Sequence, residues 1–228
     1  ARIEELPNNI YSNITKSEEY IVESKNIFIK APIEIHIIAT LWIMEVGEKL
    51  DKKLQNNVKG NRLYRDKNGF FKNDSYKLFN PYFEGYQSFR DEAIDMATHL
   101  HNKKLDVTLL NLDIQEFYYN INFNFSELED SHELNEMMQK IHDEFHIKIK
   151  DLTPREELRY KQKKFLPIGL VSSSVIANYV LSEFDKDIVE NLKPEYYSRY
   201  VDDMLFVFSN AKICLKSKTI VNDLLKCK

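Results

Sequence analysis

Two adjacent aspartates, Asp202 and Asp203, interrupt a stretch that otherwise consists of two apolar runs, "SRYV" and "MLFVF". Two carboxylates about 4 Å apart repel each other by about 4 kcal/mol at an effective dielectric constant near 20. Either water screens the pair at the tip of an exposed hairpin, or a divalent cation binds there. Mg²⁺ suits the second explanation because it takes oxygen ligands and accepts one or two protein carboxylates. The doublet alone leaves both explanations open.

A third carboxylate, Asp113, stands at the end of another apolar run. The segment "LDVTLLNLDI" is nearly continuous in apolar residues, which predicts a central strand with Asp113 at its C-terminal end. If the hairpin pairs with this strand, Asp113 and Asp202 meet on one edge of an antiparallel sheet. Carboxylates so placed can bind two cations, which clamp the attacking and leaving oxygens of an in-line phosphoryl transfer.

The elements around these aspartates alternate between helix and strand. Apolar residues between Gly85 and about Lys104 have the spacing of an amphipathic helix. The segment "FLPIGLVSSSVIANYVLSEFDKDIVENL" predicts a Pro and Gly turn, three serines able to cap, and then a helix. Its apolar residues recur every four positions, at Ile176, Val180, Phe184 and Ile188. The predicted order is helix, strand ending in aspartate, turn and helix, and hairpin.

Composition sets broad limits on the protein. With 228 residues, of which 43% are apolar, the chain can form a substantial core, and no Gly/Ser-rich or Pro-rich linker divides it. Two cysteines are too few for a metal cluster and do not suggest a disulfide framework, which favours the reducing cytoplasm. The longest apolar window is too short and too polar to span a membrane.

The net charge is −4, but basic stretches at 52–77 and 148–164 carry aromatic residues, a mixture that suits the binding of phosphates and stacked bases. Ordinary solvated faces would give the same pattern.

Three segments together resemble the palm of a reverse transcriptase. "LDIQEFYYNI" is similar to the first catalytic motif of that family, "LPIGLVSSSVIAN" to the second and "YVDD" to the third, in the right order. The resemblance implies an α+β right-hand polymerase fold in which an antiparallel palm sheet packs on helices. Fingers are expected at 1–85, palm at 86–122 and 165–228, and a finger-side helical insertion at 123–164. The thumb is expected to be absent from this chain.

The resemblance also assigns the carboxylates. Asp113, Asp202 and Asp203 match the catalytic aspartates, with Asp113 and Asp202 as the main metal ligands and two Mg²⁺ ions expected. Ile114 would add a backbone carbonyl to the metal site.

Three further positions match nucleotide-binding residues of the family. Tyr118 falls where an aromatic ring lies under the sugar of the incoming nucleotide and would clash with a 2′-hydroxyl, which favours deoxynucleotides; the alternative is a core aromatic. Gly169 and Ser173 match the turn and helix start that approach template and nucleotide.

The sequence departs from the family at several positions. Ile168 replaces a glutamine common before the motif glycine and cannot donate a side-chain hydrogen bond, and Val171 replaces the usual proline. "LPIG" in this setting is similar to bacterial abortive-infection and defence-associated members, which implies a role in antiviral defence. A triphosphate contact is expected from Lys25, Lys30 or Arg62, and a proton for the leaving pyrophosphate from Lys216 or Lys218.

These features predict an RNA-directed DNA polymerase in the cytoplasm. Its expected partners are an RNA template, a DNA product and deoxynucleoside triphosphates, with a partner protein or a homo-oligomer and no membrane. The alternatives are an untemplated or protein-primed DNA polymerase, an inactive nucleic-acid-binding module, and an RNA-dependent RNA polymerase, against which Tyr118 argues. The segment "HDEFH" has the spacing of a zinc-binding pair, but Asp143 stands where a zinc hydrolase needs glutamate, which favours a solvated acidic helix.

Overall fold

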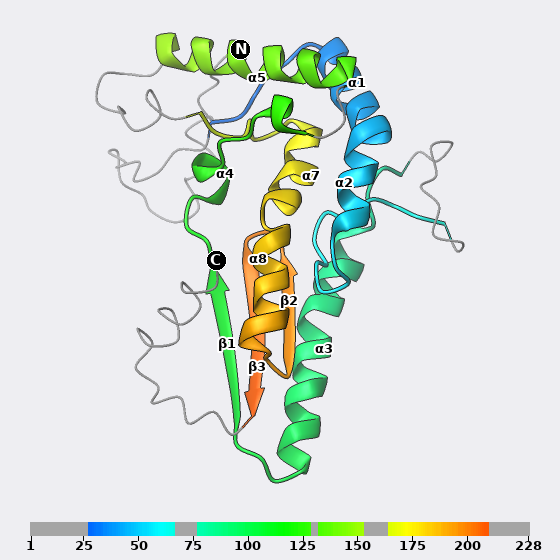
Figure 1. The fold of residues 1–228 in the computed structure, drawn as a ribbon, viewed down its shortest axis with the longest axis vertical. Coiled ribbons are helices and arrows are strands. Elements are labelled where there is room, and N and C mark those ends of the chain that lie inside the picture. Colours follow the sequence, from blue (N-terminus) through cyan, green and yellow to red (C-terminus); the bar gives the residue numbers. More distant parts are fainter. Residues whose placement is uncertain (1–26, 67–76, 129–131, 153–163, 210–228) are drawn as a thin grey trace, which may run out of the picture. The chain divides into compact units, whose positions relative to one another are not determined.

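The computed structural model describes residues 27–66, 77–128, 132–152 and 164–209, which form a mixture of helices and strands (Figure 1). They belong to two compact units. The first unit comprises Ala1–Thr40 and Tyr118–Ser173, and the second unit comprises Leu41–Phe117 and Ser174–Lys228. The assignment of fingers and palm segments stays a prediction.

The second unit contains a three-stranded antiparallel sheet. Its strands are β1 (Val107–Asp113), β2 (Tyr196–Tyr200) and β3 (Asp203–Ser209), in the spatial order β1-β3-β2. β3 lies in the middle, which explains its continuous apolar run, because a central strand that is covered on both faces reads as apolar throughout. The α+β class and the pairing of the hairpin with the strand at 107–113 are therefore confirmed.

Helical segments cover both faces of this sheet. A core cluster of Ile188, Tyr197, Met204 and Phe206 packs one face against α8 (Ser182–Asp187) and the π-helical turn η4 (Ile188–Leu192). On the other face, Ser198 Oγ donates a hydrogen bond to the Phe89 carbonyl of α3 (Tyr82–Asn102) at 3.2 Å. Figure 1 shows α8 lying over β2 and β3, with α3 running alongside β2. The second unit thus has three layers.

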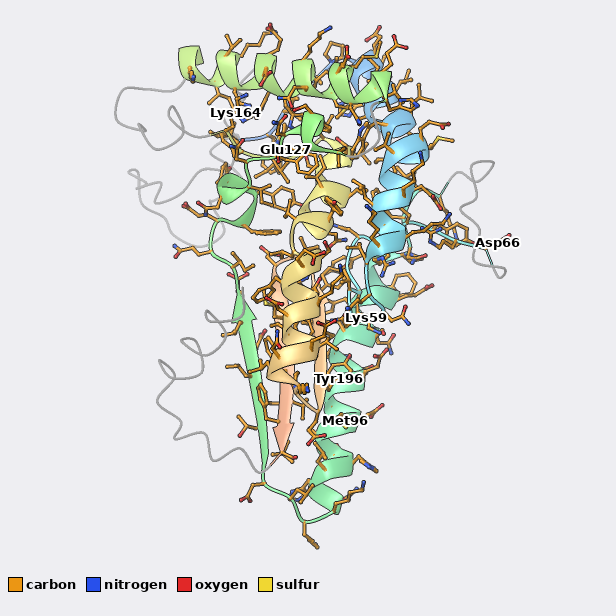
Figure 2. The ribbon with its side chains drawn as sticks, in the orientation of Figure 1. Lys59, Asp66, Met96, Glu127, Lys164 and Tyr196 are labelled. Carbon is orange, nitrogen blue, oxygen red and sulfur yellow. The ribbon has the colours of Figure 1, made fainter. Side chains whose placement is uncertain are left out.

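The segment at 57–60 extends the outer side of β2. The Arg199 N–H donates to the Asn57 carbonyl at 2.9 Å, and the Lys59 N–H donates to the Arg199 carbonyl at 2.8 Å. Lys59 Nζ also contacts both carboxylate oxygens of Glu92 on α3, at 3.0 and 2.9 Å, and the Tyr196 hydroxyl donates to the same carboxylate at 3.1 Å. Figure 2 shows Lys59 and Tyr196 beside α3. These contacts fix the segment, the strand and the helix to one another.

The remaining helices complete both units. The second unit contains η2 (Ile43–Gly47) and α2 (Glu48–Lys53), and the first contains α4 (Phe117–Asn120, which starts at the boundary), η3 (Phe125–Glu127) and α5 (Glu133–Leu152). Two helices, α1 (Ile33–Trp42) and α7 (Val171–Val180), have residues in both units. None of the helices in the described ranges is long and apolar enough to cross a membrane.

The expected long helix after the Pro and Gly turn is confirmed as helical but is divided into α7, α8 and η4. Ser173 does not act as the expected side-chain cap, since its hydroxyl donates to the Pro167 carbonyl at 2.7 Å.

The histidines of "HDEFH" lie in the core of the first unit, so the expectation of a solvated face is wrong for them. His146 Nδ1 donates to the His142 carbonyl at 2.6 Å, and its Nε2 accepts from the Phe165 N–H at 2.7 Å. Both ring nitrogens of His146 are therefore occupied by main-chain groups, which argues against zinc. Burial lowers the pKa of His142 to about 3, so this ring stays neutral.

We expect Phe206→Ala to lower the free energy of unfolding by about 3–5 kcal/mol, because it leaves a cavity in a fully buried site at the centre of the sheet. Urea denaturation followed by circular dichroism measures this. Leu109→Ala on the same sheet is the matched control, since Leu109 is 49% exposed and its truncation should cost less than about 1 kcal/mol. Equal losses for the two variants would contradict the core assignment.

Candidate active site

The register of the sheet brings the three aspartates to one end of it. Asp113 of β1 lies directly opposite Asp203 of β3, and Asp203 lies opposite Tyr200 of β2. Residues opposite each other in an antiparallel pair share a face, with Cβ atoms about 4.5–5.5 Å apart. Asp202 lies in the turn next to them, and its carbonyl accepts a hydrogen bond from the Ile114 N–H at 3.3 Å. The cross-strand partner of Asp113 is therefore Asp203, while Asp202 sits at the tip of the hairpin.

The hairpin connection consists of Val201 and Asp202 alone, because Tyr200 and Asp203 are already paired. Two-residue hairpins require positive φ at the first loop position, which glycine usually provides. Here Val201 adopts a φ of 59°. A β-branched residue in this region is strained by about 1–3 kcal/mol, and such strain persists only where the surroundings enforce the geometry. The Val201 carbonyl accepts a hydrogen bond from the buried Arg199 at 2.7 Å.

Negative charge accumulates at the hairpin tip. Burial raises the pKa of Asp202, and the neighbouring carboxylates of Asp113 and Asp203 raise it further. Burial and the Asp113 carboxylate likewise raise the pKa of Asp203. Each shift means that the folded protein resists carrying the full charge of the cluster. A bound cation would remove this penalty.

The donor set suits magnesium. Within the residues that the structure describes, no three His, Cys, Asp or Glu side chains already form a cluster around a common point. Magnesium does not need such a protein cage, because it binds through one or two carboxylates and completes its octahedral shell with water and substrate phosphates. Asp113, Asp202 and Asp203 are the candidate carboxylates, and the Ile114 carbonyl is the further candidate ligand.

The carboxylates lie at an open part of the sheet. Side chains on β1 alternate between the face that packs against α8 and η4, which carries Leu110 and Leu112, and the opposite face, on which Asn111 and Asp113 are both exposed. The neighbouring Leu109 is also exposed. Asp113 is therefore open to solvent on this face, next to the half-buried Asp203.

The other expected nucleotide-binding residues belong to the first unit. The Tyr118 carbonyl accepts a hydrogen bond from the Leu166 N–H at 3.0 Å, which joins Tyr118 to the segment that carries Gly169 and Ser173. Gly169 has a φ of 93°, a conformation that other residues rarely adopt. The structure thus brings these three residues into one part of the first unit and the aspartates together in the second. The nucleotide-binding roles of Tyr118, Gly169 and Ser173 stay predictions.

Of the expected triphosphate and proton-transfer residues, the structure describes Arg62 and Lys30. Arg62 is committed to an ion pair with the buried Asp51, with Nε 2.9 Å from Oδ1, and its Nη1 donates to the Gln55 carbonyl at 3.0 Å. Lys25, Lys216 and Lys218 lie outside the described residues. Lys30 stays a prediction.

Sequence reasoning missed the polar groups behind the hairpin. Arg199 is fully buried on the covered face of β2, where it pairs with Asp185 of α8 and contacts Asn178 of α7. The available signal was a polar residue inside an apolar run, at Asn178 in "VIANYV" and at Arg199 in "SRYV", which is uncommon for a charged residue unless it is paired. Asp185 gave no such signal, because charged residues surround it in "SEFDKDIVENL". That signal identifies candidates but does not show which of them meet.

In the absence of divalent cations, we expect Asp203→Asn to raise the melting temperature at pH 7 by about 2–4 °C, the shift that about 1 kcal/mol produces at this size. Water screens part of the repulsion at this partly exposed site, which keeps the effect modest. The folded pKa of Asp203 lies above the unfolded value near 3.9. The wild type therefore loses stability as the pH rises from about 4 through the folded pKa, and the variant is spared this loss.

Thermal unfolding in EDTA between pH 4 and pH 8, repeated with Mg²⁺, measures both effects. Mg²⁺ should stabilise the wild type more than the variant. Asp106→Asn, which changes an exposed aspartate just before the other end of β1, is the control and should show neither effect. A variant no more stable than the wild type in EDTA at pH 7 would contradict the repulsion described above.

Comparison with known proteins agrees with this geometry. Residues 48–227 match the family model described as reverse transcriptase (RNA-dependent DNA polymerase), and this range contains β1, the hairpin and all three aspartates. A search of curated proteins found none that matches the chain. Membership of such a family implies nucleotidyl transfer and the binding of nucleotides and nucleic acid. Because the match covers well over half of its length, the chain belongs to the reverse transcriptase family.

Proposed function

We propose that this protein is an RNA-directed DNA polymerase that adds deoxynucleotides at the hairpin of β2 and β3. The observation that carries the proposal is the cross-strand pairing of Asp113 with Asp203, with Asp202 beside them in the turn, in a chain of the reverse transcriptase family. An inactive binding module of the same fold would have no need to keep three carboxylates together against their mutual repulsion.

In this proposal, Asp113 and Asp202 are the main ligands for Mg²⁺, and Asp203 and the Ile114 carbonyl complete the protein's share. When bound, two Mg²⁺ ions would neutralise the charge on the attacking and leaving oxygens of the in-line transfer. The carboxylates would contribute by placing oxygen ligands at one end of the sheet, and the triphosphate and the primer end would approach from the exposed residues of β1. Positioning of this kind supplies most of the catalysis in phosphoryl transfer.

Sugar selection is proposed for Tyr118. Its ring would lie under the sugar of the incoming nucleotide, where a 2′-hydroxyl would clash with it. Gly169 and Ser173 are proposed to approach the nucleotide and template. Two features support this role: the positive φ of Gly169, which lets backbone come close to a ligand, and the hydrogen bond from Ser173 to Pro167, which fixes the turn.

The biological setting is proposed from the motif "LPIG". Its similarity to bacterial abortive-infection and defence-associated enzymes supports a cytoplasmic role in antiviral defence. An RNA template, a DNA product and a partner protein or second copy of the chain belong to the same proposal.

Untemplated or protein-primed DNA synthesis is the second candidate, and one observation favours it. Ile168 stands where many members have glutamine, and its side chain packs against the core cluster of Tyr119, Phe145, Ile149 and Phe165. Its carbonyl accepts from the Ile29 N–H at 2.8 Å. This residue therefore offers no side-chain hydrogen bond to a nucleotide or template. Sequencing the nucleic acid that co-purifies with the protein separates the two candidates, since a product without a matching RNA favours untemplated synthesis.

We expect the double substitution Asp202→Asn with Asp203→Asn to abolish incorporation of labelled deoxynucleotides in the presence of Mg²⁺. Neutral amides are poorer magnesium ligands, and the charge that attracts the ions is lost. Primer extension on an RNA template, with the fold checked by circular dichroism, measures the effect. Asp106→Asn is the control and should retain the wild-type rate. Equal incorporation by the double variant would refute the assignment of the site.

We expect Tyr118→Ala to raise the use of ribonucleotides relative to deoxynucleotides by about tenfold, which corresponds to about 1.4 kcal/mol of lost discrimination. Removing the ring opens space for the 2′-hydroxyl. A competition assay with both nucleotide types measures the ratio. Tyr119→Phe is the matched control, since it removes only the hydroxyl that accepts from the Ile27 N–H and should leave the ratio unchanged. An unchanged ratio in Tyr118→Ala would place its ring in the core instead.

A further inference from the structure

Arg199 uses every hydrogen-bond donor of its guanidinium group inside the second unit. Nε and Nη2 bind the two carboxylate oxygens of Asp185 at 2.9 and 2.6 Å. Nη1 donates to Asn178 Oδ1 at 3.1 Å and to the Val201 carbonyl at 2.7 Å, and Nη2 also donates to the Asn178 carbonyl at 3.1 Å. A guanidinium has five N–H donors, so none is left over. The group is held in a single orientation.

That orientation determines the peptide on one side of Asp202. The Val201 carbonyl belongs to the peptide unit that precedes Asp202, and Arg199 Nη1 binds it. The Asp202 carbonyl belongs to the peptide unit that follows, and the Ile114 N–H binds it at 3.3 Å. Since peptide units are planar and rigid, fixing both determines the direction in which the Asp202 side chain leaves the backbone.

The strained backbone of Val201 makes such support necessary. A valine with a φ of 59° is held away from its preferred conformations, so the turn relaxes if the surroundings allow it. Gly60 lies close against the turn, because a Cβ added at that position would be only 2.9 Å from the Val201 nitrogen, so that no larger residue fits there without a shift. Asn178 Nδ2 holds Gly60 in place by donating to its carbonyl at 2.7 Å. Asn178 therefore supports the turn through both Arg199 and Gly60.

Asp185 keeps the guanidinium aligned from the other side. Its carboxylate is 1% exposed and accepts a third hydrogen bond from the Tyr197 hydroxyl at 2.6 Å. Burial raises the pKa of Tyr197, so this hydroxyl remains a donor. A fully satisfied buried pair of this kind is often no more stabilising than well-packed apolar residues. Stability alone therefore does not explain why Arg199 also binds the Val201 carbonyl.

We propose that Arg199 is a positioning residue for the active site: oriented by Asp185 and Asn178, it holds the Val201 carbonyl and thereby aims the Asp202 carboxylate at the bound metal. The inference rests on the proposed function, in which Asp202 is a metal ligand. Arg199 itself touches neither metal nor nucleotide, because it is buried behind the turn.

Arg199→Lys tests this proposal, because lysine keeps the charge but cannot reproduce the planar fork of donors. The first readout is Mn²⁺ alone, titrated into the nucleotide-free protein and followed by electron paramagnetic resonance. We expect the half-saturating Mn²⁺ concentration to rise about tenfold. The second readout is primer extension, in which kcat per folded molecule should fall about 100-fold, the effect of a displacement of about 1 Å, while KM for the nucleotide changes less than about twofold.

The matched control is Arg65→Lys. Arg65 also pairs with two carboxylates, Glu48 and Asp51, at 2.8 and 3.1 Å, and both carboxylates belong to α2 rather than to the hairpin. This variant should lower the melting temperature while leaving the Mn²⁺ titration and kcat unchanged. A milder test is Asn178→Ala, which keeps the pair of Arg199 with Asp185. It should raise the half-saturating Mn²⁺ concentration and lower kcat, each by a smaller factor than Arg199→Lys does. Asn178→Ala takes the place of Arg199→Lys in both measurements if Arg199→Lys does not fold.

Rescue separates positioning from folding. Glycine adopts positive φ without strain, so Val201→Gly should restore part of the Mn²⁺ affinity and kcat in the Arg199→Lys background. A residue that only stabilises the fold would give no rescue per folded molecule, and this outcome would overturn the proposal. Wild-type Mn²⁺ affinity and kcat in folded Arg199→Lys would overturn it as well.

The two proposals can fail separately. If the wild type binds Mn²⁺ through Asp202, as shown by loss of binding in Asp202→Asn, but adds no nucleotide, the proposed function is wrong and the role of Arg199 is judged by the Mn²⁺ titration. If the wild type binds no Mn²⁺, both proposals are wrong. If the wild type adds nucleotides and only Arg199→Lys behaves unexpectedly, the proposed function stands without this inference.

Discussion

The site depends on the register between β1 and β3. Because side chains alternate along a strand, a slip of one residue would move Asp113 to the face covered by α8 and expose Leu112 instead. The buried apolar residues of the sheet therefore specify the register, and the register places Asp113 opposite Asp203. The alternation of side chains along β1 thus determines both which residues pack in the core and where the carboxylate of Asp113 lies. A sheet with both faces equally polar would leave the position of the carboxylates undetermined.

Two unfavourable features converge at the end of this sheet. The carboxylates repel one another, and Val201 adopts a conformation that valine avoids. Natural chains keep such features where the surrounding structure over-determines them. Here the surrounding structure is the buried pair of Arg199 and Asp185, the amide of Asn178 and the close approach of Gly60. Unfavourable interactions that are held in place by surrounding buried groups, as at this turn, are typical of functional sites.

Local patterns in the sequence predicted the strand at 107–113, the hairpin and the helical segments, because apolar spacing and charge placement are local properties. The identity of the cross-strand partner of Asp113 was less accessible, since it depends on whether the two-residue loop contains Val201 or begins at Asp202. The partners that bury Arg199 and His146 could not be predicted. An arginine in "SRYV" and a histidine in "HDEFH" look exposed until residues far along the chain, such as Asp185 and Phe165, supply their partners.

The contact between Asn178 and Gly60 has a consequence for the order in which the protein folds. The two residues lie 118 positions apart, and Ser198 contacts Phe89 across a separation of 109. Closing such long loops costs entropy that is recovered only when the sheet and its helices assemble together. During synthesis on the ribosome, the aspartate cluster cannot form until β3 has emerged. Assembly of this end of the sheet is therefore a late step, which follows synthesis of nearly all of the described residues.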